Sequence, residues 1–222
     1  MRRCIELASK NVGYTYPNPL VGSVIVCDNK VIGEGSHAKY GESHAEVNAI
    51  NSVKDKRLLK NSTLYVNLEP CNHYGKTPPC TEAIINNNIK KVVIGSQDPN
   101  KLVNGTGIKK LRSSGCDVSV GILEKECDEL NKRFFTYHKL KRPFIILKWA
   151  ESKDGFISPI KSFNTLKKVN WISGEDAKKL SHKWRSEEHS ILVGVQTIID
   201  DDPILTTSCL LYTSDAADDC VC

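Results

Sequence analysis

The chain has 222 residues, of which 40% are hydrophobic and 26% charged, and a net charge of +5, values that are ordinary for a soluble globular protein. The basic residues stand in short runs between apolar segments, which excludes the sustained basic helix or aromatic ladder of a nucleic-acid-binding protein. Since no stretch approaches the roughly 18 apolar residues of a membrane span, the sequence also predicts no membrane partner.

The N-terminal segment and the cysteine content indicate in which cellular compartment the protein is expected. The opening segment, MRRCIELASKN, has basic residues but no long apolar core, so it is not a secretory signal. The nine cysteines are therefore expected in the reducing cytoplasm, where thiols stay free or bind metal. Four of them fall in apolar-periodic segments and are expected to be small buried hydrophobic residues: Cys4, Cys27, Cys116 and Cys127.

The first part of the chain predicts alternating helices and strands. Residues 2–11 predict a helix, and a turn-rich segment follows at 16–19. Two β-rich runs, 21–27 and 31–35, surround Asp28-Asn29-Lys30 and predict a hairpin. Residues 44–53 have helical character, and 63–68 predict a strand that ends at a cysteine-containing loop.

The same alternation continues after that loop. Residues 81–88 predict a helix that Thr81 would cap, and 91–94 predict a buried strand. A helix is expected at 108–114 and a strand at 117–120. One apolar stripe indicates a last amphipathic helix: Leu123, Cys127, Leu130 and Phe134. Strands alternating with helices predict an α/β sandwich with a mixed sheet and helices on both faces.

A domain boundary is expected in the basic segment 139–143, so that residues 1–143 form a first domain. After it, 144–149 and 190–193 predict strands, and Ala177, Leu180 and Trp184 mark a helix. Roughly 65 residues cannot easily bury a core of their own, so 144–207 is expected to be the start of a second domain. Residues 208–222 lack Lys and Arg and are expected to be a non-native tail, with a flexible native tail as the alternative.

A histidine, a glutamate and two cysteines form the candidate catalytic site of the sequence. His44 and Glu46 open a predicted helix, and Cys71 and Cys80 follow a predicted strand. One imidazole and two thiolates can hold one zinc ion per chain and leave a fourth position for water, the ligand set of zinc base deaminases. Glu46 would then move protons rather than bind metal. The alternative is a structural zinc site closed by a fourth ligand, for which His73 is the nearby candidate.

The segment Gly105-Thr106-Gly107 follows a predicted strand, as a dinucleotide-binding loop would. It lacks the third glycine of that motif. We therefore interpret it as a turn.

The loop between the two cysteines resembles that of one enzyme family. It reads EPCNHYGKTPPC over residues 69–80, with eight residues between the thiols, where the compact deaminase motif has two. Together with PNPLVG at 17–22, GEGSH at 33–37 and QDPN at 97–100, it is similar to the bifunctional riboflavin-biosynthesis deaminase-reductases, over residues 1 to about 207. The resemblance implies a cytidine-deaminase-like three-layer α/β/α sandwich with a mixed sheet, followed by the start of a dihydrofolate-reductase-like α/β domain.

For the first domain, the resemblance implies zinc-dependent deamination of 2,5-diamino-6-(5-phosphoribosylamino)pyrimidin-4(3H)-one to 5-amino-6-(5-phosphoribosylamino)uracil. It makes His44, Cys71 and Cys80 the zinc ligands and Glu46 the proton shuttle. Asn18 would hydrogen-bond the pyrimidine. Other contacts to the ring or the ribose phosphate would come from His37, His73 and Lys76. As alternatives, Asn18 is only a turn former between prolines, and His37 only a surface residue at a strand end.

For the second segment, the resemblance implies NADPH-dependent reduction of the ribosyl group to ribityl. The matching stretches are LKWAESKDG at 147–155, WIS at 171–173, WRS at 184–186 and TIIDDDPILT at 197–206. By position, NADPH would be contacted by Ala150, Trp171, Thr197 and Asp201. Arg185 and Leu205 would contact the substrate, and a guanidinium group suits its phosphate.

Three departures from the family bear on this second activity. Val169 stands where the family often has a serine, and Ser208 where it usually has an arginine. The family's later glycine-rich dinucleotide-binding loop is absent from the sequence. We therefore expect a C-terminally truncated chain with an incomplete cofactor pocket and no measurable NADPH oxidation.

Two other functions are kept as alternatives. A nucleoside or nucleic-acid cytidine or adenosine deaminase would use the same scaffold, although the expanded cysteine loop argues against it. A non-catalytic, zinc-stabilised binding module would show a closed four-ligand site. The expected partner is a small phosphoribosylated pyrimidine rather than a nucleic acid or a membrane, and the apolar surface of a half-domain would allow a homo-oligomer.

Overall fold

The computed structural model describes residues 1–157 and 172–206 of the chain. It divides into two units, Met1–Phe144 and Ile145–Cys222, which are described separately. The predicted NADPH contact Trp171 and the tail 208–222 lie outside the described residues.

The first unit is built on a five-stranded mixed sheet with the strand order β2-β1-β3-β4-β5. Its first hairpin forms as predicted, and β1 also pairs antiparallel with β3. The strands β3, β4 and β5 run parallel to one another. The strand bounds are Gly22–Cys27 (β1), Lys30–Ser36 (β2), Thr63–Leu68 (β3), Lys91–Ser96 (β4) and Asp117–Val120 (β5). The mixed sheet expected from the sequence is therefore confirmed.

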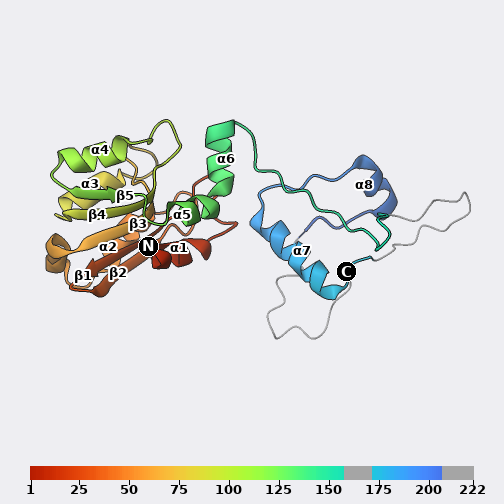
Figure 1. The fold of residues 1–222 in the computed structure, drawn as a ribbon, viewed down its shortest axis with the longest axis horizontal. Coiled ribbons are helices and arrows are strands. Elements are labelled where there is room, and N and C mark those ends of the chain that lie inside the picture. Colours follow the sequence, from red (N-terminus) through yellow and green to blue (C-terminus); the bar gives the residue numbers. More distant parts are fainter. Residues whose placement is uncertain (158–171, 207–222) are drawn as a thin grey trace, which may run out of the picture. The chain divides into compact units, whose positions relative to one another are not determined.

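Helices cover both faces of this sheet (Figure 1). One layer holds α2 (Ala45–Ser52), α3 (Cys80–Asn86) and α4 (Thr106–Ser113), because α3 contacts both α2 and α4. The other holds α1 (Arg2–Ser9) and α5 (Glu124–Leu130), which contact each other and the central strands. This is the three-layer sandwich that the sequence predicts, and it places the starts of α2 and α3 near the end of β3.

The prediction of one continuous amphipathic helix through Leu123, Cys127, Leu130 and Phe134 is wrong. The segment divides at Asn131 into α5 and α6 (Lys132–Leu140). The buried Asn131 side chain accepts a hydrogen bond from the Leu20 N–H at 2.8 Å and donates one to the Leu20 carbonyl at 2.9 Å. Because asparagine tolerates non-helical backbone well, it can end one helix here while its amide holds a distant loop. A short 3₁₀ helix, η1 (Lys56–Asn61), was not predicted.

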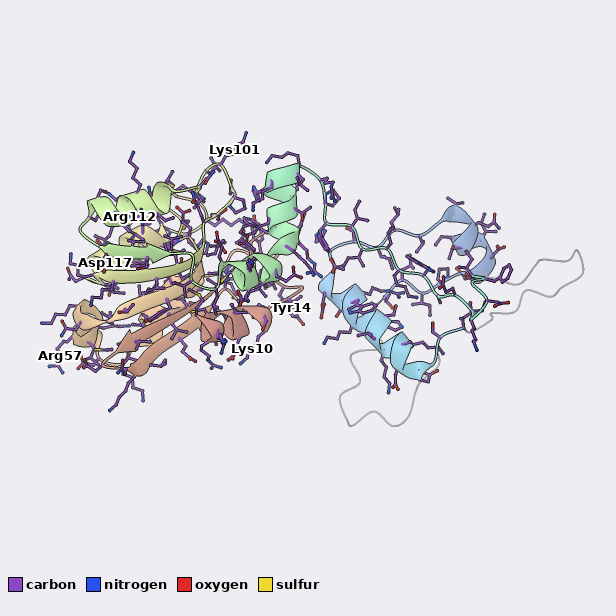
Figure 2. All side chains as sticks on the ribbon, viewed as in Figure 1. Lys10, Tyr14, Arg57, Lys101, Arg112 and Asp117 are labelled. Atoms are coloured by element: carbon purple, nitrogen blue, oxygen red, sulfur yellow. The ribbon has the colours of Figure 1, made fainter. Side chains whose placement is uncertain are left out.

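The core of the first unit lies between the sheet and the layer of α2, α3 and α4. Its fully buried side chains include Ile25, Leu64, Val66, Ile84, Ile94 and Leu111. The four cysteines expected to be buried are buried, and none of them is in a disulfide. Charged side chains such as Arg57, Lys101 and Asp117 lie on the surface (Figure 2).

In the second unit, the predicted helix is α7 (Glu175–Glu187), and a further helix, α8 (Val195–Asp201), was not foreseen. The strands predicted at 144–149 and 190–193 are wrong, since both segments have irregular backbone. A strand needs a hydrogen-bonded neighbour, and the described part of this unit contains none. Leu147 is accordingly 78% exposed and Leu192 97%.

No helix in the described ranges is both long enough and apolar enough to cross a bilayer.

Candidate metal centre

Three elements of the first unit bring His44, Cys71 and Cys80 together. His44 is the N-cap residue of α2, Cys71 follows β3, and Cys80 is the first residue of α3. The Nδ1 atom of His44 lies 3.2 Å from the Cys80 Sγ and 3.5 Å from the Cys71 Sγ. The three donor atoms all lie within 4.8 Å of one another. Residues 36 positions apart in the chain therefore form one cluster.

This cluster fits a zinc ion. In a tetrahedral site, Zn–N and Zn–S bonds of about 2.0 and 2.3 Å place the nitrogen and sulfur about 3.5 Å apart, close to the distances found. The cluster found in the described residues has three members, and His73, the predicted fourth ligand of a structural site, is not one of them. His73 is exposed on the loop between the cysteines. The donor set is therefore that of an open zinc site.

The two thiols titrate as a pair. A hydrogen bond from the Cys80 thiol, helped by one from His44, lowers the pKa of Cys71, while the same bond and burial raise the pKa of Cys80. The Cys80 N–H also points at the Cys71 Sγ, 3.4 Å away. Because thiolates are the form that binds zinc, the lowered pKa of Cys71 favours metal binding.

Glu46 lies in the first turn of α2, two residues after His44, and is 3% exposed. Burial raises the pKa of its carboxyl group, and the nearby charge of Cys71 raises it further. It is not part of the metal cluster. A buried carboxyl beside a metal site can both accept and return a proton.

Asn18 and His37 form a second polar pair beside the cluster. The Asn18 Nδ2 lies 3.0 Å from the His37 Nε2, and the His37 Nδ1 lies 3.1 Å from the Ser43 carbonyl oxygen. A carbonyl only accepts, so Nδ1 carries the proton and Nε2 accepts from Asn18. His37 is 2% exposed and its ring centroid is 5.3 Å from that of His44. The surface alternative for His37 is thus wrong, and the pair lies next to the metal cluster.

The loop that carries Asn18 is held by two buried asparagines that sequence reasoning missed. Asn67, from β3, accepts a hydrogen bond from the Gly22 N–H at 2.7 Å and donates to the Leu20 carbonyl at 2.9 Å. Asn131 binds the N–H and the carbonyl of the same Leu20. An asparagine inside the hydrophobic run 63–68 was the available signal, because a buried amide must find partners.

Two further predicted contacts, His73 and Lys76, lie on the loop between Cys71 and Cys80. Both are exposed. The Lys76 Nζ lies 4.1 Å from the centroid of the Tyr40 ring, a cation–π contact that the sequence did not suggest. The structure therefore places Lys76 against the loop that precedes His44, and leaves His73 without a place in the cluster.

Comparisons with known proteins agree on one family. Residues 1–96 match the model of the cytidine and deoxycytidylate deaminase zinc-binding region, and 143–211 match that of the RibD C-terminal domain. The chain is 47% identical over 206 residues to the riboflavin biosynthesis protein RibD of Aquifex aeolicus. It is 52% identical to the diaminohydroxyphosphoribosylamino-pyrimidine deaminase of Buchnera aphidicola, of which it covers 90%. The chain belongs to the RibD family.

Solved RibD structures have the same fold. The chain aligns with Acinetobacter baumannii RibD at a TM-score of 0.83 and 40% identity, over 92% of its own length and 55% of that chain. The deaminase/reductase of Thermotoga maritima aligns at a TM-score of 0.82 and 44% identity, over 91% and 56% of the two chains. The chain thus spans somewhat more than half the length of the RibD proteins it matches.

In the segment that matches the RibD C-terminal domain, the predicted residues are only partly gathered. Arg185, on α7, donates hydrogen bonds to the carbonyls of Ile204 and Thr206 at 3.2 and 3.3 Å, which brings it beside Leu205. Thr197 and Asp201 are exposed on α8, one turn apart. Ala150 is half-buried, just before the turn that Ser152 closes.

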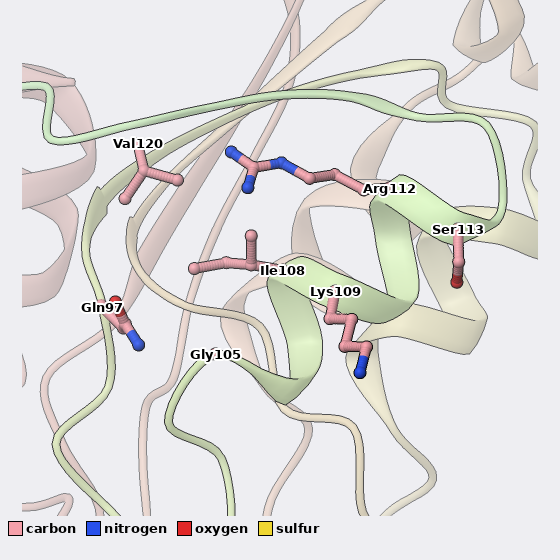
Figure 3. Close-up of a pocket in the computed structure, with 7 residues that line it drawn as sticks. All are labelled: Gln97, Gly105, Ile108, Lys109, Arg112, Ser113 and Val120. Atoms are coloured by element: carbon pink, nitrogen blue, oxygen red, sulfur yellow. The ribbon is translucent and has the colours of Figure 1, made fainter.

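A separate pocket of the first unit is lined by residues of α4 and β5 and their flanking loops (Figure 3). Its lining residues include Gln97, Ile108, Arg112 and Val120. None of the catalytic, metal-binding, substrate-binding or cofactor-binding residues predicted from the sequence lines it, so the pocket is distinct from the His44, Cys71 and Cys80 cluster. The interpretation of Gly105-Thr106-Gly107 as a turn holds for Gly105, which ends the turn before α4, whereas Thr106 and Gly107 begin that helix.

Proposed function

We propose that the first unit is a zinc-dependent deaminase of riboflavin biosynthesis. It would hydrolyse the amino group of 2,5-diamino-6-(5-phosphoribosylamino)pyrimidin-4(3H)-one to give 5-amino-6-(5-phosphoribosylamino)uracil and ammonia. The observation that carries the proposal is the cluster of His44, Cys71 and Cys80 with the buried Glu46 beside it. The Buchnera relative, 52% identical over 135 residues, is named for this deamination.

The protein's own residues would divide the work as follows. His44, Cys71 and Cys80 would hold one zinc ion per chain, and zinc, when bound, supplies a Lewis acid that lowers the pKa of water to about 7. Glu46 would take a proton from the attacking water and deliver it to the ring nitrogen. It would then pass a second proton to the departing amino group, because ammonia leaves far more readily than amide ion.

Substrate recognition would come from two sets of side chains. Asn18, whose N–H faces His37, would accept a hydrogen bond from the pyrimidine through its Oδ1. His37 would act by holding that amide as well as by bordering the ring. The exposed Lys76 and His73 would lie on the phosphate side, where a cation favours a phosphorylated substrate.

A paired measurement tests the deaminase. We expect about one zinc per chain and ammonia release from the phosphoribosylated diaminopyrimidine, with little from cytidine or RNA. Ammonia release from cytidine or RNA at a comparable rate would instead favour a nucleoside or nucleic-acid deaminase. Stoichiometric zinc without ammonia release from any of the three would favour a binding module.

For the second unit, we infer a role in the NADPH-dependent reduction of the ribosyl group. Ala150, Trp171, Thr197 and Asp201 would meet the cofactor, and Arg185 and Leu205 the substrate. The described residues supply two exposed side chains on α8 and a half-buried alanine, which do not by themselves define a cofactor site, so we derive no reduction step. An assay of NADPH oxidation with the deaminated product tests this role. We expect no measurable oxidation by this chain, and robust oxidation would contradict that expectation.

We also propose a cytoplasmic location, supported by the free thiols of the described residues. A homo-oligomer is proposed on the exposed apolar side chains of the second unit, such as Leu192 and Val195. Light scattering of the purified chain at several concentrations tests the second point.

A further inference from the structure

Glu69 is a buried carboxylate that the proposed deamination does not use. It follows the last residue of β3, is 4% exposed, and its N–H donates to the Ser96 carbonyl at 2.9 Å. Pro70 and the metal-cluster residue Cys71 come directly after it. Because a buried carboxylate is costly unless it is well hydrogen-bonded, its partners indicate its role.

Four main-chain N–H groups bind the Glu69 carboxylate. Its Oε2 accepts from Asp98 at 3.2 Å and from Gly105 at 2.9 Å. Its Oε1 accepts from Gly107 at 3.0 Å and from Ile108 at 3.2 Å. Gly105 directly precedes the first turn of α4 (Figure 3), where N–H groups lack helical partners and the helix dipole favours a negative charge. Both carboxylate oxygens of Glu69 therefore accept hydrogen bonds from the start of α4 and the loop before it.

The same helix start also packs on the residue between Glu69 and Cys71. A Cβ atom on Gly107 would overlap the carbonyl oxygen of Pro70, so only glycine lets α4 approach this closely. Glu69 and Pro70 are thus both fixed to the first turn of α4.

Cys71 itself is held from the other side by α3. Its carbonyl accepts from the Thr81 N–H at 3.2 Å, and its Sγ lies 3.4 Å from the Cys80 nitrogen. We propose that Glu69 is a positioning residue that joins the metal-binding segment to α4 and so fixes the Cys71 Sγ relative to His44 and Cys80. This inference rests on the proposed zinc site.

The test is the substitution Glu69→Gln, measured with Co²⁺ as a spectroscopic probe of the site. The amide has the shape of the carboxylate but one acceptor oxygen, so its NH₂ group would face two of the backbone N–H donors. We expect Co²⁺ affinity to fall about 10- to 100-fold, as for other residues that orient metal ligands. The ligand-field bands of the bound Co²⁺ should also change, because the Cys71 sulfur is less well placed.

The matched control is Leu111→Ala, which truncates a fully buried side chain of α4 that, being apolar, cannot hydrogen-bond the carboxylate. It should lower the stability of α4 packing while leaving Co²⁺ affinity and spectrum close to wild type. If Glu69→Gln does not give soluble protein, Glu69→Asp keeps the charge but is one methylene too short to reach all four N–H groups, and the same loss is expected.

Wild-type affinity and an unchanged Co²⁺ spectrum in the Glu69 variants would overturn the inference, as would an equal loss in Leu111→Ala. These measurements need no substrate. A wild-type chain that binds Co²⁺ in a tetrahedral site but releases no ammonia would therefore contradict the proposed deamination, while the comparison of variants still decides the role of Glu69.

Discussion

At the scale of single residues, the proposed deamination gives His44 and Glu46 separate roles, metal binding and proton transfer. His44 and Glu46 are two positions apart at the start of α2, yet the His44 Nδ1 lies among the sulfurs while Glu46 is outside the ligand group. Burial then raises the pKa of the Glu46 carboxyl above its ordinary value. The same turn of helix thus supplies a ligand and a group suited to moving protons.

Replacing Glu46 with glutamine should separate these two roles. The amide cannot carry a proton, so we expect ammonia release to fall by about 10²- to 10⁴-fold, while zinc content stays near one per chain because Glu46 is not in the ligand cluster. Metal analysis and an ammonia assay on the same preparation give the result. Near-normal turnover in Glu46→Gln would remove this residue from the mechanism.

His37 predicts a pH dependence of stability. Burial lowers the pKa of this imidazole below its ordinary value of 6.5, so between that folded-state pKa and about 6.5 the unfolded chain binds a proton that the folded chain does not. The free energy of unfolding should therefore decrease as the pH falls through this window. It should not change through His37 above or below the window.

The measurement is urea unfolding of wild type and His37→Gln at pH 7.5 and at pH 5.5. Wild type should lose more stability on acidification than the variant, which has no titratable group at position 37. The exposed His73, replaced by glutamine, serves as the control and should follow wild type. Equal losses in wild type and His37→Gln would show that His37 does not contribute.

At the scale of secondary structure, the sequence predicts those helices and strands that are determined by the local pattern of residues. Residues 63–68 and 117–120 were predicted to the residue as β3 and β5, because apolar β-rich runs bounded by polar residues specify strands locally. The break at Asn131 and the strands wrongly expected at 144–149 and 190–193 depend on partners far along the chain. Such contacts leave no periodic signal in the segment itself.

The residues of the candidate site likewise fall into those that the sequence predicts and those that it does not. The His44, Cys71 and Cys80 cluster could be predicted, because zinc restricts both the residue types and their order. Asn67 stands out as an amide within an apolar run, but its partners and those of Glu69 could not be predicted, since they are backbone groups 29 to 47 positions away. Almost every residue carries a backbone N–H group, so the sequence does not show which of these groups will bind a buried side chain.

The packing of β2 on α2 positions His44 and Glu46. This packing is so close that it requires glycine at position 35. A Cβ atom on Gly35 would overlap the backbone of Ala49 and lie 2.6 Å from the Ala45 carbonyl oxygen. Gly35→Ala should thus push α2 away from the sheet and cost about 1–3 kcal/mol in the free energy of unfolding. Zinc content should fall as well, because His44 caps that helix.

Gly75→Ala is the control, because a Cβ atom there meets nothing within 4 Å. We expect its free energy of unfolding to stay within about 0.5 kcal/mol of wild type. Both variants are compared by urea unfolding and metal analysis. A Gly35→Ala protein as stable and as zinc-rich as wild type would show that α2 moves without consequence for the site.

At the scale of the whole molecule, the stabilising core and the metal cluster belong to one unit. Every residue of the buried hydrophobic cluster lies between Ile25 and Val118, and so do the candidate metal ligands His44, Cys71 and Cys80. In the described part of the second unit, neither α7 nor α8 has a buried residue. The first unit should therefore have what it needs to fold and to bind metal without the second.

A chain ending after Phe144 tests this independence. We expect residues 1–144 to bind about one zinc, to release ammonia from the phosphoribosylated diaminopyrimidine at the rate of the full chain, and to melt within about 5 °C of the first transition of that chain. The Buchnera deaminase supports this, since the alignment with it spans 135 residues. Cys80→Ser in the same fragment is the control and should lower zinc content, because one of three ligands is lost. A fragment that is insoluble, or that folds but loses zinc and ammonia release, would show that residues beyond 144 complete the first unit.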